Sequence, residues 1–173
     1  MIGLTNTMLI SLFILLNMNK LHAQPSELKL DQIELMKQFL GTWKGELDNN
    51  TIFMCENKQF GNGAISNSMI TTDGMVVDSV VQIYGYDNKT EKFIIAELKE
   101  SSPVIELCSI WFTSENTGEI IIINPENTPL RFKFEFMSPN MIEQTAIQDN
   151  KVVNKIVLKR VEENKYSTNS CFY

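Results

Sequence analysis

From residue 42 onward, polar and apolar residues alternate with a period of two, and turn-forming residues break this pattern at short intervals. The clearest example is residues 131–136, where three phenylalanines alternate with three charged side chains. Successive side chains of a β-strand point to opposite faces, so this segment predicts a half-buried strand with its phenylalanines inward and its charges outward. The same reasoning predicts strands over residues 42–47, 51–60, 64–71, 76–86, 92–100, 104–112, 119–124, 130–137, 141–148 and 151–162.

The segments between these strands contain residues that favour tight turns. Gly61-Asn62-Gly63, Asp73-Gly74 and Asp149-Asn150 tolerate positive φ or form Asx turns, which predicts hairpins between neighbouring strands. Sequential hairpins form an antiparallel meander, and a long open meander leaves edges that invite aggregation. We therefore predict an all-β fold, namely an up-and-down antiparallel β-barrel of about 8–10 strands with a short N-terminal helix.

The N-terminal helix is predicted from residues 27–40, which carry apolar side chains at helical spacing. Ser26 and Asp31 are alternative starts, and Gly41 marks the end. Residues 120–123 and 152–153 are apolar on both faces of their strands, which indicates that the outer wall is covered there. We expect the helix to provide this cover, as a lid or plug of the barrel.

An export signal is predicted at the start of the chain. Residues 8–16 form an apolar run too short to span a bilayer, and Leu21-His22-Ala23 precedes Gln24 in the manner of a cleavage site. Residues 1–23 are therefore interpreted as a signal peptide and residues 24–173 as a single exported domain, periplasmic or extracellular. Because no basic residue precedes the apolar run, retention as an N-terminal anchor is the alternative.

Charge and histidine content argue against several kinds of chemistry. The formal net charge of -6 and the scattered basic residues disfavour nucleic acid and anionic membranes as partners. His22 is the only histidine and lies within the predicted signal, so the exported domain offers no imidazole for a catalytic triad, a zinc site or haem. No catalytic residue, metal site or cofactor is predicted.

Three cysteines, Cys55, Cys108 and Cys171, match no metal-binding spacing. Their odd number in an oxidising compartment leaves at least one thiol free or paired between chains. Cys55 and Cys108 fall in apolar strands and are expected to be small buried hydrophobic residues, whereas Cys171 is expected on a loose C-terminal tail.

The sequence around the first strand resembles a known family of barrels. Residues 39–46, Phe-Leu-Gly-Thr-Trp-Lys-Gly-Glu, are similar to the Gly-x-Trp opening of lipocalin-like (calycin) barrels, in which a short helix leads into the first strand. Together with residues 84–93 and 155–161, this opening resembles a bacterial family of uncharacterised lipocalin-like domains over residues 35–162.

The resemblance implies a structural role for Gly41, Trp43 and Arg160, the closure of the barrel. In lipocalin-like barrels the tryptophan closes one end of the cavity, and a basic residue late in the last strand lies across its ring as a cation–π contact. Arg160 occupies the matching position here. Gly41 would let the backbone turn tightly from helix to strand.

A closed barrel of this size can enclose one small ligand, and such cavities are mainly apolar. We therefore expect an exported lipocalin-like protein that binds a small hydrophobic ligand. The candidate lining residues are aromatic, although each is also suited to simple core packing: Tyr84, Tyr86, Trp111, Phe132, Phe134 and Phe136.

Two other functions stay open. An envelope interaction module with a filled barrel would form a homodimer through its doubly apolar strands and an unpaired cysteine. A hydrolase or isomerase based on carboxylates would need Glu97 and Glu106, which lie in largely apolar strands, to face each other in the cavity.

Overall fold

The computed structural model describes residues 29–124 and 128–162. The first regular element in this part of the chain is a short helix α2 (Gln32–Met36), which continues into a 3₁₀ helix η1 (Lys37–Phe39). Asp31 caps α2, because its carboxylate accepts a hydrogen bond from the backbone N–H of Ile33 at 3.1 Å. The predicted helix is present, and its α-helical part is shorter than the pattern suggested.

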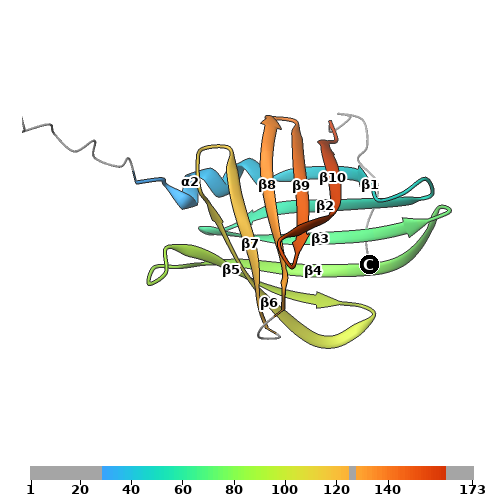
Figure 1. Ribbon diagram of the computed structural model, residues 1–173, viewed down its shortest axis with the longest axis horizontal. Coiled ribbons are helices and arrows are strands. Elements are labelled where there is room, and N and C mark those ends of the chain that lie inside the picture. The colour runs from blue at the N-terminus through green and yellow to red at the C-terminus, as the bar shows by residue number, and fades with distance from the viewer. Residues whose placement is uncertain (1–28, 125–127, 163–173) are drawn as a thin grey trace, which may run out of the picture.

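Ten antiparallel strands follow in the described residues and close into one barrel (Figure 1). Each strand pairs with its neighbours in the chain, and the first pairs with the last, so the predicted all-β up-and-down barrel is confirmed. The strands are β1 (Gly41–Glu46), β2 (Thr51–Phe60), β3 (Gly63–Thr72), β4 (Met75–Asp87), β5 (Lys92–Lys99), β6 (Ser102–Phe112), β7 (Thr117–Asn124), β8 (Leu130–Ser138), β9 (Met141–Gln148) and β10 (Lys151–Arg160).

The ribbons of β7–β10 in front run nearly crosswise to those of β1–β4 behind (Figure 1). Helix α2 lies at one end, on the left in this view. The β1–β2, β3–β4 and β5–β6 hairpins turn at the opposite end, on the right, which we call the open end.

Strand register decides which side chains face the interior. Trp43 lies opposite Cys55, and Cys55 lies opposite Ser68, so these three share the inner face of β1, β2 and β3. Phe134 is buried on the inner face of β8, whereas Lys133 points outward and lies 3.6 Å from the Glu119 carboxylate. The predicted inward direction of the β8 phenylalanines is confirmed.

Aromatic side chains fill the α2 end of the barrel. The Phe39 ring, at the end of η1, packs edge-on against Phe134 and Phe136, with centroid distances of 5.1 and 4.9 Å. Gly118 makes room for this cluster, because a Cβ there would lie 2.1 Å from the Phe134 Cζ atom. The helix therefore plugs one end of the barrel over a tightly packed core.

The expectation that the helix covers the outer wall was wrong. Ile121 and Ile123 of β7 are 40% and 39% exposed, and Val152 and Val153 of β10 are 58% and 54% exposed. The helix instead buries its apolar side chains against the barrel end, where the aromatic core offers more apolar contact than the wall does.

Candidate functional site

Arg160 closes the α2 end of the barrel by holding the chain that leads from η1 into β1. Its guanidinium carbon lies 4.2 Å from the centroid of the Trp43 ring, which is the cation–π contact that the resemblance implied. The guanidinium also donates to the backbone carbonyls of Leu40, Gln38 (2.9 Å) and Pro139 (3.1 Å). This one side chain therefore ties the helix, the β8–β9 turn and the last strand together.

Gly41 permits this close approach. Its φ is +105°, a conformation that side chains with a Cβ rarely adopt, and an added Cβ would lie 2.7 Å from the Arg160 Nη1 atom. Trp43 is 1% exposed, and its indole N–H donates to the Phe39 carbonyl at 2.8 Å. Through these contacts Gly41, Trp43 and Arg160 form a packed, hydrogen-bonded cluster at the α2 end of the barrel, away from the open end.

Exposure of the barrel-facing side chains increases from the α2 end toward the open end. On β5, Phe93 and Ile95 are buried, whereas Glu97 and Lys99 beyond them are half-buried. The same change occurs along other strands, from Cys55 to Phe53, from Phe134 to Phe132 and from Leu158 to Ile156. Core packing thus stops partway along the barrel.

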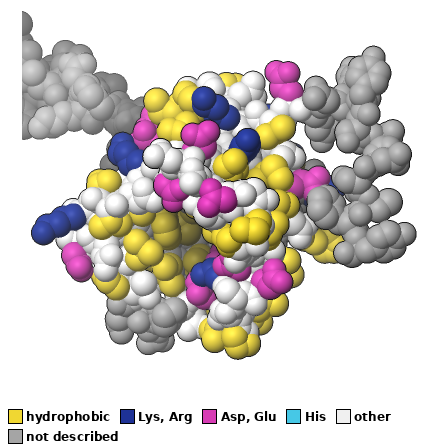
Figure 2. Space-filling model, turned by 90° about the vertical axis from the view of Figure 1, so that its right-hand side faces the viewer, with side chains coloured by type: hydrophobic (Ala, Val, Ile, Leu, Met, Phe, Trp, Pro, Cys, Tyr) yellow, Lys and Arg dark blue, Asp and Glu magenta, His cyan; other side chains and the backbone are white. Residues whose placement is uncertain are grey.

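The open end contains a hollow with hydrophobic side chains in its wall (Figure 2). Strand register places a group of half-buried apolar residues on the inner face of this half of the barrel: Phe53, Ile70, Ile120, Ile122, Phe132 and Ile156. Apolar side chains inside a closed barrel remain accessible only where other side chains do not fill the space. This inner space at the open end is the candidate binding site, which we call the hollow.

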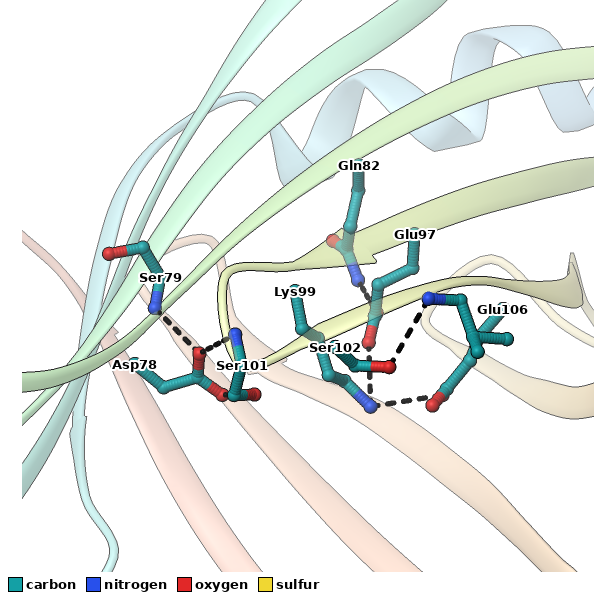
Figure 3. A network of polar contacts seen from close by, with 9 residues as sticks. Asp78, Ser79, Gln82, Glu97, Lys99, Ser101, Ser102 and Glu106 are labelled. Carbon is teal, nitrogen blue, oxygen red and sulfur yellow. Dashed lines mark hydrogen bonds and ion pairs between the residues drawn. The ribbon is translucent and has the colours of Figure 1, made fainter.

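A polar network lies on one wall of the hollow (Figure 3). The Gln82 amide donates to the Glu97 carboxylate, whose other oxygen lies 3.3 Å from the Lys99 Nζ atom. Lys99 also donates to Glu106 at 2.9 Å, and the Tyr84 hydroxyl donates to the Gln82 side-chain carbonyl at 2.7 Å. Gln82, Tyr84, Glu97, Lys99 and Glu106 form what we call the polar network.

The register of three strands creates this network. Gln82 on β4 lies opposite Glu97 on β5, and Glu97 lies opposite Glu106 on β6. Like charges directly opposite each other destabilise a sheet, and Lys99 offsets this repulsion by pairing with both carboxylates. Burial lowers the pKa of Lys99, but its contacts with Glu106 and Glu97 outweigh this effect, so the pKa is raised overall. Two carboxylates and one ammonium leave one negative charge in the wall.

The structure places the six predicted lining residues in three different environments. Phe134 and Phe136 belong to the packed core, and Tyr86 packs there against Phe93, with ring centroids 5.1 Å apart. Tyr84 and Phe132 face the interior nearer the open end, and only Tyr84 belongs to the polar network. Its burial raises the pKa of the Tyr84 hydroxyl above its usual value.

Trp111 lies on the outer wall and does not line the interior. Its neighbours in β6, Ile110 and Phe112, are buried inside, so the alternation of the strand turns Trp111 outward. The Lys92 ammonium lies 3.5 Å from the centroid of its ring. The lining role predicted for Trp111 is therefore corrected to an outer cation–π contact.

Cys55 and Cys108 are both free thiols on the inner face, and Cys55 is buried as predicted. Burial raises the pKa of each thiol to about 11. A thiol with so high a pKa carries little thiolate at neutral pH, which makes it a poor nucleophile. Cys171 and His22, like the predicted signal peptide, lie outside the described residues.

Gln82 and Lys99 were not singled out from the sequence. The signal that would have found them is the hairpin register: the short turn between β5 and β6 places Glu97 opposite Glu106, and a basic residue two positions after Glu97 then falls beside both. Gln82 would have been found from the register of the preceding hairpin, in which β4 pairs with β5 and Gln82 lies opposite Glu97. Its own segment gives no such signal, because it is a run of apolar residues.

Comparison with models of known protein families finds none that matches the chain, and comparison with curated proteins finds no matching relative. The closed antiparallel barrel itself is consistent with a lipocalin-like fold. Among the described residues, no helix has the length and hydrophobicity needed to cross a bilayer. The same residues contain no group of three or more histidine, cysteine or acidic side chains arranged to hold a metal ion.

Proposed function

We propose that the protein is an exported lipocalin-like carrier or receptor that binds one small, largely apolar molecule in the hollow. The observation that carries this proposal is the half exposure of barrel-facing apolar residues such as Phe53 and Phe132 inside a closed barrel. Water in contact with such a surface is unfavourable, and its replacement by an apolar ligand is favourable.

The polar network sets the chemistry of the ligand's polar end. Its net charge is negative, and the Lys99 ammonium is already paired with both Glu97 and Glu106. A ligand carboxylate would compete with those two carboxylates for Lys99 and would face their repulsion. The network is therefore suited to an amine or another group that donates hydrogen bonds, at one end of an apolar body.

A carboxylate-based reaction receives less support from the same residues. Glu97 and Glu106 do face each other in the interior, as a hydrolase or isomerase would require. Both are held in ion pairs with Lys99, whereas general acid–base chemistry needs one carboxyl group free to take up and release a proton. We assign the pair to ligand recognition.

The proposal is tested by filling the hollow. Ala146 is half-buried on the inner face of β9, opposite Phe132 on β8, so Ala146→Trp places an indole in the hollow. We expect this variant to bind Nile red, a neutral apolar dye, about tenfold or more weakly than the unmodified protein. In the unmodified protein, dodecylamine should displace the dye at lower concentration than dodecanoate.

The neighbouring residue provides a matched control. Thr145 also lies on β9 but faces outward, opposite Lys133, so Thr145→Trp adds the same side chain outside the barrel. This variant should retain full dye affinity. Equal dye binding by all three proteins, with light scattering showing a stable dimer, would replace ligand binding with the interaction-module function.

A further inference from the structure

The hairpin tips at the open end carry large apolar side chains in contact with solvent. Met75, Val76 and Val77, which begin β4, are 69%, 57% and 57% exposed, and Val104 and Ile105 near the start of β6 are 57% and 55% exposed. We call these five residues the apolar tips. The space-filling view of this end shows hydrophobic side chains beside the hollow as well as within it (Figure 2).

The two hairpins that carry the apolar tips are joined to each other. Asp78 on β4 accepts hydrogen bonds from the hydroxyl (3.0 Å) and the backbone N–H (3.3 Å) of Ser101 in the β5–β6 turn (Figure 3). The Glu100 N–H also donates to the Ser79 carbonyl at 2.8 Å. The apolar tips therefore project together from one side of the molecule, to the right in Figure 1.

Acidic residues predominate in the two hairpins that carry the apolar tips. Asp73, Asp78 and Glu100 are acidic, and Lys99, the only basic residue in residues 73–78 and 99–105, pairs with Glu97 and Glu106. An anionic surface would be repelled by this arrangement, and so would the same acidic tips on a second copy of the chain. The partner that fits these properties has an apolar interior below a surface that carries no net negative charge.

We infer that the apolar tips insert into the interface of a neutral, zwitterionic lipid surface and hold the open end of the barrel against it. Apolar side chains grouped on projecting turns gain most from such a surface, since each can be buried there without a matching pocket. The inference rests on the proposed ligand binding, because an apolar ligand could then pass between the lipid and the hollow without crossing water.

Quenching by brominated phosphatidylcholine vesicles tests where the protein touches lipid. In the full chain, Val76→Trp and Val104→Trp each place an indole at a tip, and the unmodified protein gives the background from Trp43 and Trp111. We expect the added fluorescence of both variants to fall about twofold or more when the tips enter the bilayer interface. This readout locates the contact even if residues 1–23 are retained and also bind lipid.

Phe60→Trp is the matched control. Phe60 is 70% exposed, more than any apolar tip, but it lies at the end of β2 nearest the α2 end of the barrel. Its added fluorescence should stay unquenched. Equal quenching of all three variants, or stronger quenching after phosphatidylglycerol replaces part of the phosphatidylcholine, would overturn the inference. A concentration-dependent dimer that shields the tip tryptophans without lipid would assign the tips to a second copy instead.

Nile red binding without vesicles separates this inference from the proposed function. A protein that binds the dye but shows no quenching at Val76→Trp or Val104→Trp keeps its ligand site and loses the lipid contact. A protein whose tips are quenched but which binds no dye keeps the lipid contact and loses the ligand site.

Discussion

Arg160 shows how one side chain can decide the local geometry of a barrel end. Three of its N–H groups donate to carbonyls of two separate segments, the end of η1 and the β8–β9 turn, and its flat face covers the Trp43 ring. Lysine could not reproduce this arrangement, because its ammonium is a point charge without the planar fork of arginine. The left-handed φ of Gly41 is part of the same arrangement, since only a residue without Cβ leaves room for the guanidinium.

We expect Arg160→Ala to lower the free energy of unfolding by about 2–4 kcal/mol, because it removes charge-assisted hydrogen bonds and leaves the Leu40 and Gln38 carbonyls without their donor. Urea denaturation followed by the combined fluorescence of Trp43 and Trp111 measures the change. Arg131→Ala is the control, since within the described residues the Arg131 side chain makes one hydrogen bond, to Asn150 at 3.3 Å, and its loss should cost less than about 0.5 kcal/mol. Similar losses in the two variants would contradict a closing role for Arg160.

Among the elements, the helical plug depends on side chains that reach the barrel backbone. Gln32 of α2 donates to the Phe112 carbonyl at 3.0 Å and accepts from the Phe112 N–H at 2.7 Å. These two hydrogen bonds attach α2 to the backbone of β6. A helix of this length is unstable alone, so α2 persists through these bonds and through the packing of Phe39 on the core.

Gln32→Ala should therefore loosen the plug and lower the free energy of unfolding by about 1–3 kcal/mol, because it leaves the Phe112 N–H and carbonyl unpaired at a partly buried site. Faster hydrogen exchange at the Phe112 amide, measured by NMR, should accompany the loss. Gln38→Ala is the comparison: within the part of the chain that the structure describes, the Gln38 side chain makes one hydrogen bond, which is exposed, to the Glu115 carbonyl at 2.8 Å. A protected Phe112 amide in Gln32→Ala would show that packing alone holds the plug.

The strands could be predicted from the sequence because their signals are local. Alternation and turn residues lie within each hairpin, and the bounds predicted for β2 and β9 match the structure residue for residue. The position of the helix could not be predicted, because it depends on a contact between Gln32 and a strand eighty residues later. Apolar outer residues such as Val153 were wrongly predicted to be covered, because periodicity identifies apolar residues but gives no information on their tertiary contacts.

At the scale of the whole molecule, the sequence predicted a barrel with an apolar interior, but it identified only some of the residues that face this interior. Trp111 follows Ile110 and precedes Phe112, and a run of three apolar residues has no alternation from which to choose the inner pair. The sequence also did not decide on which face of the sheet Glu97 and Glu106 lie. The register of β5 and β6 places them opposite each other on the inner face. The division of the barrel into a filled half and a hollow half arises from all ten strands together.

This division also makes the protein sensitive to alkali. A thiol in the unfolded chain loses its proton near pH 9, whereas burial raises the pKa of Cys55 and of Cys108 in the folded barrel to about 11. Above pH 9 the unfolded chain therefore binds fewer protons than the folded one, so stability decreases as the pH rises. Burial acts in the same direction on Tyr84, whose folded pKa is also raised.

We expect the midpoint of urea denaturation to fall steadily between pH 9 and pH 11. The titration of Cys55 alone should lower the free energy of unfolding by on the order of 2 kcal/mol over this range. Cys55→Ala should make this fall shallower, even if the variant is less stable at pH 7, because the slope depends only on protons bound. Met54→Ala, which shortens the next side chain on the outer face of β2, should keep the full slope. If Cys55→Ala and Met54→Ala show the same slope, Cys55 is not shielded from water, and the packed half of the barrel ends closer to α2 than Cys55.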